Sequence, residues 1–213
     1  MNLTNYYWYF QSAVPSRICD EIVKYSKSIQ DQMAVTGGFG RKQGEKPLSQ
    51  QQVKDLKKKR DSDIVWLNER WIYKEVQPYV HKANVNAGWN FDWDHSESMK
   101  FTQYNKGQYY DWHCDGWDKP YQRQQGDPSH GKIRKLSVTL TLSDPKDYKG
   151  GELEFDFRNL DPDKKRKVIK CKEILPKGSL VVFPADLWHR VCPVKKGTRH
   201  SLVMWNLGWP FKW

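Results

Sequence analysis

The sequence YNKGQYYDWHCD, residues 104–115, gives the strongest indication of the fold of this chain. Its second half, Gln108–His113, is rich in aromatic residues and predicts a β-strand, and Met99–Tyr104 just before it predicts another. Residues two apart on a strand point to the same face, so His113 and Asp115 place an imidazole beside a carboxylate. The stretch therefore predicts a sheet protein with a polar site at the end of one strand.

More short segments of this kind follow, separated by turns that contain Gly, Pro or Asp. Each is rich in Val, Leu, Thr or aromatic residues and has the length of a strand. They are Lys135–Leu142, Glu152–Phe157, Ser179–Phe183, Leu187–Cys192 and Ser201–Leu207. Many short strands favour a jelly roll, so we expect a mostly β fold with a double-stranded β-helix core at residues 96–213. Residues 1–95 should support this core within one domain.

The N-terminal part mixes helical and strand patterns. Strands are expected at Tyr6–Phe10 and Asp63–Leu67. One helix should begin at Pro15–Ser16, because apolar residues recur after it at helical spacing. A second helix should cover Ile72–Ala83, with a kink or an early end at Pro78. These helices are expected to pack against the jelly roll.

The net charge of +11 is concentrated in two stretches. Residues 36–60 hold eight Lys or Arg and two acids, and residues 158–172 hold seven Lys or Arg and two acids. Both are expected to be loops, the first of them long and mobile. Solvated loops that keep the protein in solution are the favoured interpretation. A basic rim for an acidic protein or for nucleic acid is the alternative, although the scarcity of aromatic residues weakens the nucleic-acid version.

No segment of the sequence predicts a membrane or secretory function. No run approaches the roughly 18 apolar residues of a membrane-spanning helix, and the N-terminus lacks the regions of a signal peptide. The four cysteines, Cys19, Cys114, Cys171 and Cys192, are scattered without a CxxC pair. These features predict a cytoplasmic protein in a reducing compartment, and they are consistent with a bacterial or phage origin.

His189 is the candidate third ligand of a metal site. It follows the apolar run Val181–Phe183 and Pro184, and a jelly roll makes such chain-distant strands neighbours. Two histidines and one carboxylate form a facial triad that leaves positions open on Fe(II). Catalytic zinc accepts the same ligands. The other histidines lack this context and are assigned to the surface or the core: His81, His95, His130 and His200.

The presence of Arg199 ten residues after His189 favours the interpretation of the site as an iron site over a zinc site. A guanidinium is a planar fork that pairs with a carboxylate. An iron enzyme that uses 2-oxoglutarate needs a cation for the distal carboxylate of that co-substrate, whereas a zinc hydrolase has no general need for one. A salt bridge at the end of a strand is the alternative role of Arg199.

Four passages resemble the Fe(II)/2-oxoglutarate-dependent dioxygenases of the prolyl 4-hydroxylase type, in particular the bacterial and phage PKHD-type hydroxylases. Residues 104–115 are similar to the family pattern Y-x-x-G-Q-x-Y-x-x-H-x-D. The other passages are Lys135–Asp144, Gly150–Leu153, and Phe183–Pro184 continued through His189–Val191 and Pro193–Val194 to Arg199 and Trp205. The resemblance covers about residues 60–213.

This resemblance implies the roles of five residues. His113, Asp115 and His189 would ligate Fe(II), and Arg199 would pair with the C5 carboxylate of 2-oxoglutarate. Tyr104 matches the tyrosine whose hydroxyl supports that carboxylate. Dioxygen would be the second co-substrate, and ascorbate is a candidate additional cofactor.

Five further residues are candidates by position. Thr141 occupies a position near the co-substrate that often carries tyrosine, and threonine keeps the hydroxyl with less reach. Tyr110 and Trp205 match aromatic positions that line the iron pocket, with core packing as the alternative. Trp117 and Arg190 are also assigned to the substrate pocket, although Arg190 is adjacent to His189 and would point to the other face of a strand.

The resemblance implies hydroxylation of a C–H bond, with a prolyl residue of a protein or peptide as the favoured substrate. The acid at Asp115 argues against a related halogenase, in which that ligand is missing. Residues 36–60 and 116–132 are candidate substrate loops. Two alternatives stay open: a nucleic-acid demethylase, although residues 200–213 lack the second arginine of that branch, and a non-catalytic metal-binding module. We expect a monomer or a dimer.

Overall fold

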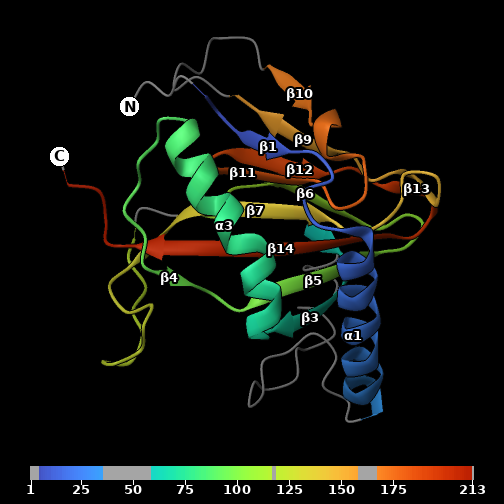
Figure 1. The fold of residues 1–213 in the computed structure, drawn as a ribbon, viewed down its shortest axis with the longest axis horizontal. Helices are drawn as coiled ribbons and strands as arrows, with labels where there is room; N and C mark the ends of the chain where they lie inside the picture. The colour runs from blue at the N-terminus through green and yellow to red at the C-terminus, as the bar shows by residue number, and fades with distance from the viewer. Residues whose placement is uncertain (1–4, 36–58, 117–118, 158–166, 213) are drawn as a thin grey trace.

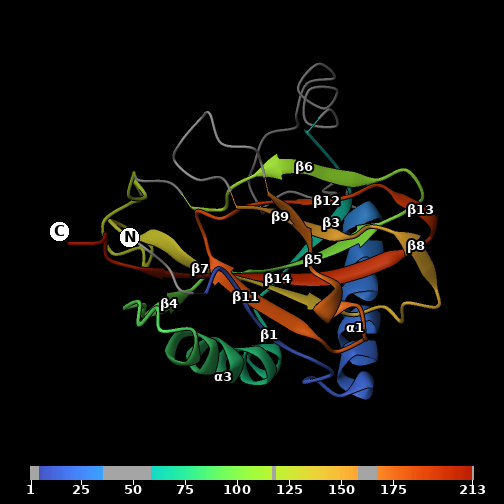
Figure 2. The ribbon, with the colours of Figure 1, turned by 90° about the horizontal axis from the view of Figure 1, so that it is seen from above.

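Two antiparallel β-sheets stack face to face, and two helices cover the outer face of the larger sheet (Figures 1 and 2). The computed structural model describes residues 5–35, 59–116, 119–157 and 167–212, with the side chains of residues 30–35 excepted. The predicted loop at residues 36–60 lies outside this description except for its last two residues. Seen from above, the layers run from helices to large sheet to small sheet.

The large sheet has the strand order β1-β11-β7-β14-β5-β3, with β4 paired to β14. Its strands are β1 (Trp8–Phe10), β3 (Asp63–Leu67), β4 (His95–Ser96), β5 (Met99–Tyr104), β7 (Ile133–Thr141), β11 (Leu180–Pro184) and β14 (Arg199–Gly208). The long strands β7 and β14 form its centre, and each predicted strand of this sheet is present.

The small sheet has the strand order β10-β9-β12-β6-β2. A separate two-stranded antiparallel sheet pairs β13 with β8. These strands are β2 (Arg60–Asp61), β6 (Tyr109–His113), β8 (Tyr148–Gly150), β9 (Leu153–Asp156), β10 (Val168–Lys170), β12 (Trp188–Val191) and β13 (Val194–Gly197). The prediction of a jelly-roll core packed against N-terminal helices is confirmed.

Alternation along the strands separates an apolar outer face of the large sheet from a polar inner face. On β7, Leu136, Val138 and Leu140 belong to the core under the helices, whereas Ser137 and Thr139 are buried on the opposite face. The period of two that strands impose explains this split. The apolar side stabilises the domain, and the polar side faces the small sheet.

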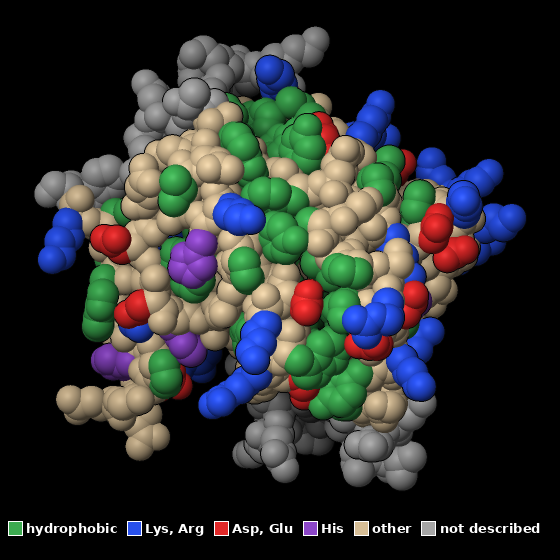
Figure 3. Space-filling view, in the orientation of Figure 1, with side chains coloured by type: hydrophobic (Ala, Val, Ile, Leu, Met, Phe, Trp, Pro, Cys, Tyr) green, Lys and Arg blue, Asp and Glu red, His purple; other side chains and the backbone are tan. Residues whose placement is uncertain are grey.

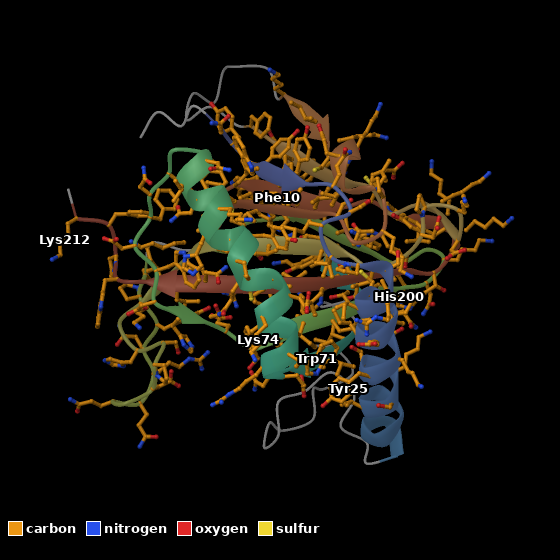
Figure 4. The ribbon with its side chains drawn as sticks, in the orientation of Figure 1. Phe10, Tyr25, Trp71, Lys74, His200 and Lys212 are labelled. Atoms are coloured by element: carbon orange, nitrogen blue, oxygen red, sulfur yellow. The ribbon has the colours of Figure 1, made fainter. Side chains whose placement is uncertain are left out.

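Helices α1 (Ser16–Val35) and α3 (Arg70–Asn86) supply the other half of that core. The middle of α1 meets the start of α3 where the rings of Tyr25 and Trp71 pack 6.3 Å apart (Figure 4). The expectation that α3 ends early at Pro78 is wrong, because the helix continues to Asn86. Pro78 is exposed, whereas Val76 and Val80 on either side of it are fully buried.

The second basic stretch is partly structured. Val168–Lys170 form β10 and pair with β9, and Lys172–Ile174 form a short 3-10 helix, η1. The expectation of a continuous loop at residues 158–172 is therefore wrong at its C-terminal end. The β-branched residues Val168 and Ile169 fit the edge of a sheet.

The surface that bears the helices mixes apolar, acidic and basic side chains (Figure 3). Lys and Arg side chains project at the margin near β13, where Lys149, Lys195 and Lys196 are exposed. In the described parts of the chain, neither helix is both long and apolar enough to cross a membrane.

Replacement of Gly178 by alanine should destabilise the fold, because Gly178 ties the start of α1 to the large sheet. Its carbonyl accepts from Val14 N–H at 3.0 Å and its N–H donates to the Thr141 carbonyl at 2.9 Å. Gly178 has φ +79°, and an added Cβ would lie 2.0 Å from the Val14 carbonyl oxygen. We expect Gly178→Ala to lower the free energy of unfolding by at least about 2 kcal/mol in urea titrations.

Gly126→Ala is the matched control. Gly126 also has positive φ, but an added Cβ there would have no atom within 4 Å. It should lose only about 1 kcal/mol, the cost of the left-handed backbone itself. Equal losses in both variants would show that the contact with Val14 contributes nothing.

Candidate metal and co-substrate site

A β-bulge in β6 aims two rings into the space between the sheets. His113 pairs with His189 of β12, and Tyr110 pairs with Val191, so β6 has one extra residue between these pairs. Such a bulge changes which face the following side chains reach. The rings of Tyr110 and His113 consequently stack, with centroids 3.5 Å apart. The rings of His113 and His189 are 4.2 Å apart.

Asp115 lies just beyond the end of β6, where backbone and side chain are both fixed. The N–H groups of Asp115 and Gly116 donate to the Ala185 carbonyl at 2.9 and 2.7 Å. The Ser137 hydroxyl donates to Asp115 Oδ2 at 2.8 Å. The carboxylate is 6 % exposed, so these contacts hold it in one orientation.

The structure brings His113, Asp115 and His189 together as a group that could hold a metal ion. One ligand atom from each residue lies within 4.8 Å of the other two. Nε2 of His113 is 3.7 Å from Asp115 Oδ1, and Nε2 of His189 is 3.5 Å from Oδ2. No other group of three His, Cys, Asp or Glu side chains with this spacing occurs in the described residues.

Hydrogen bonds assign the tautomer of both histidines. Nδ1 of His113 is 2.7 Å from the Asp111 carbonyl, and Nδ1 of His189 is 2.9 Å from the Leu187 carbonyl. A carbonyl only accepts, so each Nδ1 carries the proton and each Nε2 presents a lone pair. The lone pairs face the carboxylate, as metal ligation requires.

The electrostatics of the group also fit a divalent cation. Burial, followed by the charge of His189, lowers the pKa of His113 to about 3, so its imidazole is neutral at pH 7. Burial would raise the pKa of Asp115, but the fields of His189, His113 and Arg134 outweigh it, and the pKa lies below its usual range. Two imidazoles and one carboxylate are the donor set of Fe(II) facial triads.

Arg199 is a buried guanidinium that faces the same interior. It is 2 % exposed, its Nη1 donates to Ser201 Oγ at 3.3 Å, and its Cζ is 5.6 Å from the Tyr104 ring. Among the described side chains, no carboxylate forms an ion pair with it. A buried charge without a counterion is costly, so the position fits an anionic ligand.

Gly151 makes room for the arginine stem. It has φ +65°, and an added Cβ would lie 2.9 Å from Arg199 Cδ and 3.0 Å from Val194 Cγ2. The pair Gly150–Gly151, both with positive φ, therefore does more than permit a tight turn. It lets the backbone approach Arg199 closely.

Hydroxyl groups line the inner face of the large sheet between Arg199 and Asp115. Tyr104 pairs directly with Arg199, and Thr141 pairs with Ser201. The full set of buried hydroxyl residues on this face is Thr102, Tyr104, Ser137, Thr139, Thr141 and Ser201. The interior thus offers a cation at one end, three candidate ligands at the other and hydrogen-bonding groups in between.

Two of the four predicted substrate-pocket residues reach this interior. Tyr110 stacks on His113, and Trp205 is 3 % exposed. Arg190 does not reach it: its guanidinium pairs with Glu154 at 2.7 Å, and its side chain is 37 % exposed. Arg190 therefore belongs to the outer face of the small sheet, and its assignment to the pocket is wrong. Trp117 lies outside the described residues.

Sequence reasoning missed two cations beside Trp205. The Cζ atom of Arg134 is 3.9 Å from the Trp205 ring, and Nζ of Lys100 is 4.8 Å from it. Lys100 shares a strand face with Tyr104, four positions away. Strand alternation could therefore have predicted that Lys100 points to the same interior as Tyr104. Arg134 lies next to a register shift between β7 and β14, and no sequence pattern predicts that shift.

The remaining histidines do not join the group. His81 stacks on Trp93 with centroids 4.5 Å apart. His200 packs on Phe101 beneath α1, and its position is marked in Figure 4. Both observations agree with their assignment to surface and core.

Comparison with known proteins places the chain in a family. The family model of the 2OG-Fe(II) oxygenase superfamily matches residues 99–206. The chain belongs to this superfamily. The matched region contains the three candidate ligands and Arg199.

Curated relatives match the same half of the chain. A PKHD-type hydroxylase from Pseudoalteromonas atlantica is 36 % identical over 108 residues, which is 50 % of this chain and 41 % of the relative. The PKHD-type hydroxylase YbiX from Escherichia coli is 36 % identical over 106 residues, 49 % of this chain and 40 % of the relative. The chain thus covers about two fifths of the length of these relatives.

Solved structures share the fold over nearly the whole chain. The viral collagen prolyl hydroxylase of Paramecium bursaria Chlorella virus-1, in a 2OG complex, has a TM-score of 0.62 at 20 % identity and covers 96 % of this chain and 97 % of its own. A Trichoplax adhaerens prolyl hydroxylase, in complex with a peptide fragment of hypoxia inducible factor, has a TM-score of 0.63 at 19 % identity, with 95 % and 84 % covered.

Replacement of Ser137 by alanine should weaken metal binding, because it removes the hydrogen bond that orients Asp115. Loss of such a supporting contact costs about tenfold to a hundredfold in affinity. Titration with Co(II), followed by its visible absorbance, measures the effect. Thr139→Ala is the control, since Thr139 lies on the same strand face and the hydrogen bond to the Asp115 carboxylate comes from Ser137. Equal affinity of the Ser137 variant and wild type would show that the hydrogen bond does not orient the carboxylate.

Replacement of Lys100 by methionine should stabilise the metal-free protein. Burial, more than any neighbouring charge, lowers the pKa of Lys100 from 10.5 to about 7. Removal of a buried charge without an ion-pair partner among the described acids should raise the free energy of unfolding by about 1–4 kcal/mol.

The pH dependence of this gain follows from linkage. Below pH 7 Lys100 is protonated in both the folded and the unfolded protein, so the full free-energy cost of burying its charge is present. Between pH 7 and 10.5 the unfolded chain holds a proton that the folded chain lacks, so wild-type stability rises with pH. The difference between Lys100→Met and wild type should therefore shrink from about pH 6 to about pH 10 in urea titrations. A gain that does not change over this range would contradict the burial of a charged ammonium.

Proposed function

We propose that this protein is an Fe(II)- and 2-oxoglutarate-dependent dioxygenase that hydroxylates a prolyl residue in a protein or peptide. The observation that carries the proposal is one interior with two complementary ends. A His-Asp-His group lies at one end, and the buried Arg199 lies at the other without a carboxylate partner among the described residues. A linear dicarboxylate that bound both ends would lie along the hydroxyl groups between them.

Different residues would bind the metal ion and the co-substrate. His113, Asp115 and His189 would hold Fe(II), with Ser137 fixing the carboxylate. When bound, Fe(II) and 2-oxoglutarate supply the activation of dioxygen. Arg199 would pair with the distal carboxylate of the co-substrate, and Tyr104 and Thr141 lie beside it on the paired strands.

Tyr110 and Trp205 would border the reacting C–H bond. Tyr110 stacks on the ligand His113, and Trp205 lies on the strand that pairs with Ser137. Large rings at these positions exclude water from the site and hold the substrate close to the metal. An apolar ring such as proline packs well against such surfaces.

The comparisons support the prolyl assignment by analogy. Several curated relatives are named PKHD-type hydroxylases, and several solved structures with this fold are prolyl hydroxylases. One of those structures contains a peptide, which supports a peptide or protein as the substrate here.

The first test is the reaction itself. Purified protein with Fe(II), 2-oxoglutarate and dioxygen should form succinate and add one oxygen to proline-containing peptides from a bacterial proteome digest. Mass spectrometry under ¹⁸O₂ locates the added oxygen, and Asp115→Ala is the inactive control. Labelled oxygen found only on residues other than proline would reject the prolyl assignment and keep the dioxygenase assignment.

The second test concerns Arg199. Arg199→Ala should weaken 2-oxoglutarate binding about tenfold to a hundredfold, since a charged hydrogen-bond pair is lost. Metal affinity should change little, because Arg199 contacts none of the ligands. Isothermal titration of Zn(II) into the metal-free protein measures the metal affinity, and titration of 2-oxoglutarate into the Zn(II)-loaded protein measures the co-substrate affinity. The control Arg190→Ala removes an arginine from the outer face, and equal effects of the two variants would contradict the assigned role.

A further inference from the structure

Lys100 is a buried lysine in the wall of the proposed substrate pocket. It is 5 % exposed and projects from β5 on the same face as Thr102 and Tyr104. Its Nζ atom lies 4.8 Å from the Trp205 ring and 5.5 Å from the Tyr110 ring. Since Tyr110 stacks on His113, one ring separates the ammonium from a candidate metal ligand.

This ammonium forms no ion pair with a described acid, and the charges of Asp115 and Glu97 act on it only from a longer distance. The contrast with Arg134, on the same tryptophan, is informative: Arg134 forms an ion pair with Glu97 at 2.5 Å. Aromatic faces attract a cation, but they recover only a part of the hydration that burial removes. Lys100 therefore has unused capacity for an anion.

Two further donors near Lys100 also lack partners in the part of the chain that the structure describes. The indole Nε1–H of Trp205 and the hydroxyl of Thr102 are buried without a hydrogen bond. Thr102 is two positions from Lys100 on the same strand face. Lys100 and these two donors lie on the same face of the large sheet, and donors without acceptors there favour a ligand that carries oxygen atoms.

The co-substrate does not account for this capacity. Strand pairing sets Arg199 opposite Tyr104 and Val203 opposite Lys100, so the two cations are four residues apart along the sheet. Their charged groups also contact different rings, since Arg199 Cζ is 5.6 Å from the Tyr104 ring and Lys100 Nζ is 4.8 Å from the Trp205 ring. The dicarboxylate of the proposed function already uses one end at Arg199 and the other at the metal, and Lys100 is left for a third anionic group.

We infer that Lys100 is the specificity-determining cation of the substrate pocket, and that the substrate presents a carboxylate within reach of the reacting C–H bond. The inference rests on the proposed function and specifies its substrate class. The carboxylate belongs either to an acidic side chain next to the target residue or to a free C-terminus. A neutral substrate would leave the buried charge unpaired, and this penalty is the source of discrimination.

Matched peptides test the inference by binding alone. One pair of short prolyl peptides differs only by Glu or Gln next to proline, and a second pair ends in proline with a free carboxylate or an amide. Both pairs are also made with alanine in place of proline. Their dissociation constants are measured by calorimetry on full-length protein loaded with Zn(II) and 2-oxoglutarate, where no turnover occurs.

Wild type should bind the carboxylate member of one pair at least about tenfold more tightly. Lys100→Met and Lys100→Gln should lose this preference while the dissociation constant of 2-oxoglutarate stays within about twofold. The pair that shows the preference identifies the side chain or the terminus as the source of the carboxylate.

Lys135→Met is the matched control. Lys135 is also 5 % exposed and also lies over an aromatic ring, with Nζ 4.1 Å from Phe211, which packs against the core cluster under the helices. This variant should retain the preference. Loss of preference in it as well would assign the effect to general packing and overturn the inference.

Two other results would overturn the inference. One is the absence of discrimination in every pair, including absence of binding. The other is a loss of 2-oxoglutarate affinity in the Lys100 variants as large as the loss for the peptides, which would place Lys100 in the co-substrate site. A carboxylate preference that persists in the alanine peptides, together with no prolyl hydroxylation, would reject the prolyl assignment and leave Lys100 as the carboxylate receptor.

Discussion

The hydrogen bond from Ser137 to Asp115 is the contact on which the rest of the site depends, because it joins the two sheets at the metal position. Asp115 follows a strand of the small sheet, whereas Ser137 is at the centre of the large one. The Ala185 carbonyl, just beyond β11, fixes the Asp115 backbone from the same side. With the carboxylate held by one sheet and both histidines carried by the other, small relative movements of the sheets would separate the candidate ligands.

Such a site requires a polar interior, and the fold confines that interior to one side of one sheet. The helices and the outer face of the large sheet hold the extended apolar core, which includes Ile22, Val80 and Leu140. The inner face can therefore carry hydroxyl groups and the buried Arg199 without loss of the domain's main hydrophobic stabilisation. Gly151 illustrates the local adjustment, since its missing side chain gives Arg199 room to extend inward.

Regular alternation is the part of this structure that the sequence predicts, and broken alternation is the part that it does not. The strands of the jelly roll follow period-two reasoning, whereas Asp115 lies beyond the end of β6 and is held by contacts with Ala185 and Ser137. The bulge that brings Tyr110 to the face of His113, and the register shift that turns Arg134 inward, are set by pairing with distant strands. For the same reason β2, β4, β8, β10 and β13 were not predicted: these short strands form because partners from elsewhere in the chain pair with them.

Charge balance connects the proposed function with Lys100. Fe(II), the Asp115 carboxylate and doubly charged 2-oxoglutarate together leave one negative charge, which Arg199 neutralises. The Arg134–Glu97 pair is neutral by itself. A protonated Lys100 then leaves one positive charge in a space shielded from water, where an isolated charge is costly. A substrate with one carboxylate would complete the balance on entering, and the pocket would reach neutrality only when co-substrate and substrate are both present. Electrostatics would in this way favour the assembly of the full complex over any partial one.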